Sequence, residues 1–329
     1  MLKQSVPPTF ASTALLEKAM HCRLMLLLLA FGLTIAPICA QQQEAYQNFD
    51  ADEEVLSLDT NLVVLNLTIT EKNEKYVSGL KVDDLKVLED NLPQQILSFE
   101  FEETSFAAVI LLDTSASMEQ KIALEQAACA DFIGGIRGGD SFAIYSFGGA
   151  TVREIQDFTT SVLLPDSVRT LQAEGPTPLY DAIVRAASVL AQRPERRRAI
   201  LVVSDGADTN SKVSLGHALR MVIGGQISVY AVDLTRTEIS GANRNDNGTE
   251  VLKALAEKTG GKFFQTPGGN KLREAFAKTV DELRHQYTIT YQSTNDNYNG
   301  RWRAIEVRIA HPKLNVRTRQ GYFARKKRT

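Results

Sequence analysis

The chain has 329 residues, of which 43% are hydrophobic and 23% are charged, with 37 Lys and Arg against 39 Asp and Glu. This balance is typical of a globular protein and argues against a disordered tail, a collagen-like fibre or a coiled-coil rod. The length predicts two domains that can each bury a core. A net charge of −2 lacks the basic excess of nucleic-acid binders, so we expect no nucleic-acid partner.

The first forty residues have the layout of a secretory signal. An apolar run of 13 residues, 24–36, follows Arg23 and ends shortly before Ala40, after which we expect cleavage. Translation from Met1 or from Met20 gives the same mature chain, which we expect in the periplasm or outside the cell. Because the run is shorter than the ~20 residues that span a bilayer, no stable membrane span is expected after cleavage. An uncleaved anchor is the less favoured alternative.

Alternating hydrophobic residues predict strands near both ends of the mature chain. These strands cover residues 62–70, 82–89, 95–101, 287–291, 305–309 and 321–323. We expect a β domain in two parts, 59–104 and 286–324, which form one sandwich or two separate small modules. A flexible acidic segment, 41–58, precedes them, and a basic tail, 325–329, follows.

Strands and helices alternate between residues 105 and 285. The continuous apolar run 107–112 is typical of a central parallel strand that is covered on both faces. Further strands are expected at 142–147, 152–158, 199–204, 227–232 and 262–265, with helices at 121–136, 179–191, 215–223, 251–259 and 272–285. The predicted fold class is therefore α/β: a doubly wound, mostly parallel, Rossmann-like sheet, inserted in or flanked by a smaller all-β sandwich-like domain.

Oxygen-bearing side chains follow the predicted strands at one edge of this sheet. Asp113, Ser115 and Ser117 come after the first strand, Asp205 follows a later central strand, and Thr177 precedes a helix. Ligands of open α/β sheets bind beyond the carboxyl ends of the strands. Hard oxygen donors suit Mg²⁺ first and Mn²⁺ next, with Ca²⁺ also possible, and the lack of His or thiolate argues against zinc.

This set resembles, in order and approximate spacing, the metal-ion-dependent adhesion site of a von Willebrand factor A-type (VWA) domain. The flanks are similar to those of exported bacterial proteins called VWFA-related, in Gly79-Leu80-x-x-x-Asp84-Leu85, Trp302-Arg303-x-Ile305-x-Val307 and Gly321-Tyr322-Phe323. The resemblance implies that Asp113, Ser115, Ser117, Thr177 and Asp205 hold the ion directly or through water. It also implies that an acidic side chain of a partner protein takes the remaining coordination position.

We therefore expect an exported, non-enzymatic, metal-dependent protein-binding module of unspecified oligomeric state. The alternatives are a scaffold without metal-bridged binding and, less favoured, a metal-dependent hydrolase. Ser115 stands where phosphatases that form an aspartyl-phosphate need a second acid, and no dinucleotide-binding glycine motif or G-x-S-x-G sequence stands out. Three other residues are given structural roles: a buried thiol for Cys129, support of a loop or helix start for Asp181, and a core anchor for Trp302.

Overall fold

The computed structural model describes residues 62–326, except 102, 150, 235–246 and 267. The predicted signal (1–40), the predicted flexible segment (41–58) and residues 327–329 of the predicted basic tail lie outside the described residues. Among the helices that the structure describes, none combines the length and the apolar character that crossing a membrane requires.

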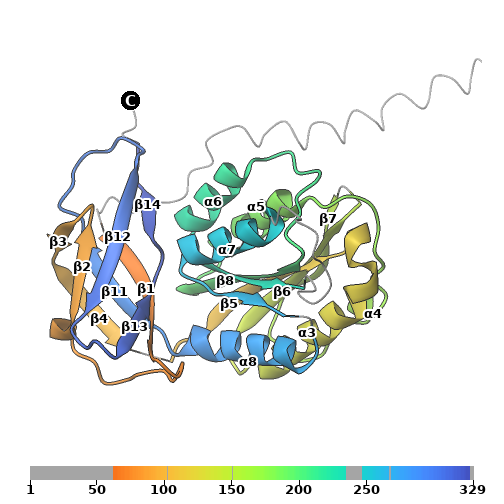
Figure 1. The fold of residues 1–329 in the computed structure, drawn as a ribbon, viewed down its shortest axis with the longest axis horizontal. Coiled ribbons are helices and arrows are strands. Elements are labelled where there is room, and N and C mark those ends of the chain that lie inside the picture. Colours follow the sequence, from red (N-terminus) through yellow and green to blue (C-terminus); the bar gives the residue numbers. More distant parts are fainter. Residues whose placement is uncertain (1–61, 102, 150, 235–246, 267, 327–329) are drawn as a thin grey trace, which may run out of the picture. The chain divides into compact units, whose positions relative to one another are not determined.

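A six-stranded sheet forms the centre of the α/β part, in the order β10-β9-β8-β5-β6-β7 (Figure 1). The strands are β5 (Phe106–Asp113), β6 (Ser141–Gly148), β7 (Thr151–Thr159), β8 (Arg197–Ser204), β9 (Ile227–Asp233) and β10 (Phe263–Gln265). Neighbours from β10 to β6 are parallel, and the edge strand β7 is antiparallel to β6. The carboxyl ends of β5, β8 and β9 therefore meet at one edge, as predicted.

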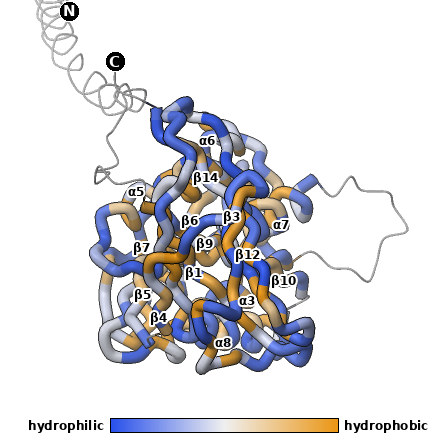
Figure 2. Tube along the Cα trace, turned by 90° about the vertical axis from the view of Figure 1, so that its left-hand side faces the viewer, coloured by the Kyte–Doolittle hydropathy of each residue, from blue (hydrophilic) through white to orange (hydrophobic). Residues whose placement is uncertain are grey.

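Helices cover both faces of this sheet (Figure 1). α5 (Leu179–Ala191), α6 (Leu215–Gly224) and α7 (Asn247–Thr259) pack on one face. α3 (Ile122–Gly135), the short α4 (Asp166–Arg169) and α8 (Asn270–Arg284) pack on the other. All eight residues of β5 are buried between these layers, and Figure 2 shows hydrophobic stretches of the chain gathered in the interior. The doubly wound prediction is confirmed, and Cys129 is a buried free thiol on α3, as expected.

Two antiparallel sheets form the β part, in the orders β13-β1-β11-β4 and β14-β12-β2-β3. Their strands are β1 (Leu62–Glu71), β2 (Leu85–Glu89), β3 (Leu92–Gln94), β4 (Ile96–Phe101), β11 (Tyr287–Gln292), β12 (Trp302–Ile309), β13 (Leu314–Arg317) and β14 (Gly321–Phe323). Each sheet mixes strands from before and after the α/β part, and residues of both sheets, such as Leu67 and Val307, share one core. The smaller all-β domain of the prediction is therefore present, whereas its exact boundaries stay predictions.

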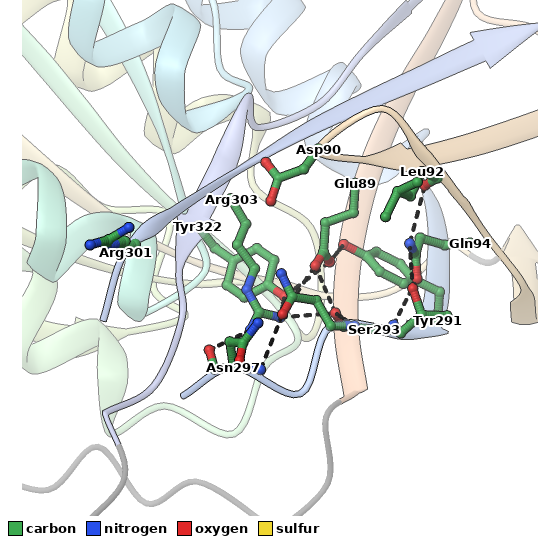
Figure 3. A network of polar contacts seen from close by, with 12 residues as sticks. Glu89, Asp90, Leu92, Gln94, Tyr291, Ser293, Asn297, Arg301, Arg303 and Tyr322 are labelled. Carbon is green, nitrogen blue, oxygen red and sulfur yellow. Dashed lines mark hydrogen bonds and ion pairs between the residues drawn. The ribbon is translucent and has the colours of Figure 1, made fainter. Parts of the chain in front are cut away.

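The first residue of β12, Trp302, is not buried as expected. Trp302 is 38% exposed and lies edge-on against Phe323, with ring centroids 5.0 Å apart, so the prediction that it anchors the core is wrong. The two-residue period of the strand turns Arg303 inward in its place. Arg303 pairs there with the buried carboxylate of Glu89, within the polar network drawn in Figure 3.

A buried carboxylate at the end of α8 joins the α/β part to the β part. Glu282 Oε1 accepts hydrogen bonds from Thr68 Oγ1 of β1 (3.1 Å) and Tyr230 OH of β9 (2.7 Å), and it pairs with Arg317 of β13. The helix then runs directly into β11. Side chains from three strands therefore fix the end of α8.

Candidate functional site

The first loop of the predicted site begins at the carboxyl end of β5. Asp113, the last residue of that strand, has no exposed surface. Its Oδ1 accepts a hydrogen bond from the Ser115 N–H (2.9 Å), and its Oδ2 accepts one from Ser204 Oγ at the end of β8 (2.5 Å). The loop bends back on its own carboxylate, which fixes the direction of the Asp113 side chain.

The two serine hydroxyls of this loop differ in their exposure to solvent. Ser115 is buried, whereas Ser117 is exposed, and their Oγ atoms lie 3.1 Å apart within hydrogen-bonding distance. Ser117 belongs to a 3₁₀ turn, Ala116–Lys121, that precedes α3. Ser115 is the N-cap residue of this turn, but its side chain makes no capping hydrogen bond.

The loop that carries Thr177 is tied to the first loop and to the loop after β8. The Ala116 N–H donates to Gly175 O (3.0 Å). The buried Thr177 donates its N–H to Thr209 Oγ1 (2.8 Å), and its carbonyl accepts from the Thr209 N–H (2.9 Å). These bonds fix the main chain of Thr177. Its position therefore depends on the loop after β5 and the loop after β8.

Two further carboxylates hold the loop after β8 against the start of α5. Asp208 Oδ1 accepts from Ser211 Oγ (2.5 Å) within the loop and from the Tyr180 N–H of α5 (3.3 Å). Asp181 Oδ1 accepts from the N–H groups of Lys212 (3.0 Å) and Val213 (3.1 Å). Asp181 therefore supports the loop after β8, whereas the sequence predicted support of the Thr177 loop or of the helix start. Asp205, at the beginning of this loop, is partly exposed, and its Oδ1 accepts a weaker bond from the Ala207 N–H (3.3 Å).

Gly206 limits where the Asp205 loop can lie. Its φ is +77°, and a Cβ atom there would lie 2.2 Å from the carbonyl oxygen of Gly248 in α7. We expect Gly206→Ala to lower the free energy of unfolding by about 2–4 kcal/mol, from left-handed strain and overpacking. The matched control is Gly134→Ala in α3, where a Cβ meets no atom within 4 Å. This control should be neutral or stabilising in denaturant titration; equal losses in both variants would contradict the steric argument.

An acidic residue that we did not predict lies beside Asp113. Glu125 of α3 is 1% exposed, and its Oε1 accepts from the Asp113 N–H (3.2 Å). Burial is the main cause that raises the pKa of Asp113 to about 6 and the pKa of Glu125 well above its usual value. Asp205 raises both values further through its charge. Ionising either carboxyl at this strand end is therefore unfavourable unless a positive charge lies nearby.

The donor set suits a hard divalent cation. Among residues 62–326, apart from the undescribed gaps, no group of three or more His, Cys, Asp or Glu is arranged to hold a metal ion. A cation site that uses hydroxyls as well as carboxylates stays a prediction from the sequence. The structure brings Asp113, Ser115 and Ser117 together directly. Asp205 is linked to them through the preceding residue, Ser204, which donates a hydrogen bond to Asp113. Thr177 is linked to them through the main-chain bonds of its loop.

Residues 108–207 match the family model of the von Willebrand factor type A domain. The chain contains a VWA domain. The matched segment begins inside β5 and runs past the end of β8, so it includes all five predicted site residues. Outside the match, α6, α7 and α8 pack on the same sheet.

Solved structures with a VWA domain are among those similar to this chain. The conserved hypothetical protein BatB from Bacteroides thetaiotaomicron is 16% identical with a TM-score of 0.45, covering 54% of this chain and 98% of that one. A von Willebrand factor type A protein from Catenulispora acidiphila is 12% identical with a TM-score of 0.45, covering 82% and 76%. The vWF domain of the type V pili tip protein Mfa5 from Porphyromonas gingivalis is 13% identical with a TM-score of 0.44, covering 54% and 95%. No curated protein matches the chain.

Proposed function

We propose that this VWA domain is a metal-dependent protein-binding module. Asp113, Ser115, Ser117, Thr177 and Asp205 hold a divalent cation, Mg²⁺ in preference to Mn²⁺ or Ca²⁺, and an acidic side chain of a partner protein completes its coordination. The observation that supports this most is the buried Asp113 carboxylate, at which the loop after β5 and the end of β8 meet. Buried acidic groups in close proximity are unfavourable without a compensating positive charge, which a divalent cation supplies.

The chemistry of the site favours binding over catalysis. The contacts around Asp113 come from serine hydroxyls, carboxylates and main-chain N–H groups. In the described site no imidazole or thiol adjoins a hydroxyl to activate it as a nucleophile. We therefore propose a non-enzymatic role. The apolar run at residues 24–36 supports export of this module to the periplasm or the cell exterior.

Calorimetric titration of Mg²⁺ and Mn²⁺ into the chelator-stripped protein tests the metal site. We expect saturable binding that Asp205→Ala weakens by about 100-fold or more, since the loss of even a supporting group costs roughly 10–100-fold. The matched control is Asp166→Ala, which removes a fully exposed carboxylate of the same domain and should leave the affinity unchanged. A folded wild-type protein that binds neither ion would remove the proposal and leave the scaffold alternative.

Retention on a carboxylate surface tests the partner chemistry. We expect the protein to bind immobilised polyglutamate in Mg²⁺ and to elute with chelator, whereas a polyglutamine surface should not retain it. Asp205→Ala should elute early in both conditions, because it lacks the acidic group that helps to hold the ion. Equal retention of the wild type and Asp205→Ala would show that general electrostatics, and not a bridging ion, explains the binding.

A further inference from the structure

The buried acid of α3 lies on a surface of the helix that is otherwise apolar. Glu125 precedes Ala128, Cys129, Phe132 and Ile133 at helical spacing, and all five residues are buried. Acidic side chains are almost never fully buried unless they are paired. The position of Glu125 is therefore not explained by packing alone.

The two carboxyl oxygens of Glu125 have different surroundings. Oε1 accepts the Asp113 N–H at the end of β5 (3.2 Å). Oε2 is buried, and within the part of the chain that the structure describes it has no hydrogen-bond partner. An oxygen of this kind is costly to bury, because it has lost its water without gaining a donor. The unsatisfied oxygen lies next to the residue on which the proposed metal site depends.

The nearby charges are mostly of the same sign. Asp113 and Asp205 both act on Glu125 as negative neighbours, whereas Lys121, the residue before α3, acts as a positive one. Lys121 is only half-buried, so water screens its charge. Three acidic groups therefore surround one strand end, with one partly solvated cation close to them. A divalent cation bound at this strand end would offset the excess of acidic groups.

We infer that Glu125 is a positioning residue of the metal site, with one carboxyl oxygen fixing the Asp113 main chain and the other adding the negative charge that strengthens cation binding. This inference rests on the proposed function. It assigns a sixth residue to the site, from a helix that contributes none of the five predicted residues. It also gives a reason for an acid on the apolar face of α3: the side chain is unfavourable in the metal-free protein and favourable in the metal-bound one.

Glu125→Gln separates charge from shape, because glutamine keeps the size of the side chain and an oxygen that can accept the Asp113 N–H. In chelator, we expect the variant to melt at the same temperature as the wild type or higher, because it no longer buries an acid whose ionised form is unfavourable without a cation. In saturating Mg²⁺, we expect a smaller rise in melting temperature than in the wild type. The dissociation constant for Mg²⁺, measured by calorimetry, should increase about tenfold, within the range for supporting residues of metal sites.

The matched control is Glu119→Gln. Glu119 is an exposed acid of the turn that also carries Ser117. Its substitution changes the net charge by the same amount as Glu125→Gln but leaves the contact between Glu125 and Asp113 intact. We expect an affinity within about twofold of the wild type, because exposed charges are screened. Equal losses in both variants would overturn the positioning role, as would unchanged Mg²⁺ affinity in Glu125→Gln. A wild-type protein that binds no Mg²⁺ would contradict the proposed metal site itself. A wild type that binds Mg²⁺ with an affinity that Glu125→Gln does not change would contradict only the role of Glu125.

Discussion

Arg303→Met should lower the free energy of unfolding by about 3–5 kcal/mol, the range for breaking a buried ion pair by removing one partner. Arg303 Nη1 lies 3.2 Å from Glu89 Oε1, and the two residues are 6% and 2% exposed. The same nitrogen donates to Ser293 Oγ (2.9 Å) and Tyr322 OH (3.0 Å). Figure 3 shows these groups converging on the Glu89 carboxylate. Methionine fills part of the space but leaves Glu89 buried without its cation.

Arg308→Met is the matched control on the same strand. Arg308 pairs with Glu306 (2.7 Å), but both side chains are more than half exposed, so we expect a loss of at most about 1 kcal/mol. Urea or guanidinium titration of both variants measures the difference. The double variant Glu89→Gln with Arg303→Met should recover part of the loss, because it also removes the unpaired charge. Equal losses in Arg303→Met and Arg308→Met would contradict the importance of burial.

Arg197→Met should lower the free energy of unfolding by a similar amount, about 3–5 kcal/mol, by another mechanism. Arg197 is 2% exposed at the start of β8, and its guanidinium donates to the carbonyls of Leu283 (3.0 Å), Arg284 (2.7 Å) and Gln286 (2.7 Å). These carbonyls end α8 and lead into β11, where the helix itself provides no donors. Each buried carbonyl that loses its partner costs roughly 1–3 kcal/mol.

The neighbouring Arg196→Met is the control for this substitution. Arg196 has a side chain that is 75% exposed and lies 3.7 Å from Glu100, so its loss should change stability by less than about 1 kcal/mol. Hydrogen exchange gives a second measurement: the amides of residues 280–292 should lose protection in Arg197→Met before the rest of the sheet does. If protection falls evenly over the whole chain, the guanidinium does not act locally at the end of α8.

Most helices and strands were predictable because their hydrophobic period is local. The run 107–112 became β5, and the alternation from residue 62 became β1. α7 begins at Asn247, four residues before the predicted helix, because its first turn is polar and carries no apolar period. Residues 82–84 form a 3₁₀ turn where an extended segment was predicted. Asp84 Oδ2 accepts the Lys81 N–H there (2.8 Å), a side-chain bond that competes with extended backbone.

The candidate site was predictable where it depends on strand ends and not where it depends on packing across the sheet. Asp113 and Asp205 follow parallel strands, so the rule for α/β sheets places both at one edge. Glu125 was missed, because an acid in the first turn of a helix has an ordinary explanation in the helix dipole. The available signal was its helical spacing from Ala128 and Cys129, which puts a carboxylate on the buried face of α3.

The pairing of β1 has a consequence for the order in which the chain can fold. Both neighbours of β1 in its sheet, β11 and β13, come from the far end of the chain, and β1 contacts Glu282 across 214 positions of sequence. At synthesis rates of roughly 5–20 residues per second, β1 waits on the order of ten seconds or more for either of these neighbouring strands. The α/β part lies between these strands and has its own core. Its earlier folding would bring residues 105 and 285 close together and shorten the loop that sandwich assembly must close.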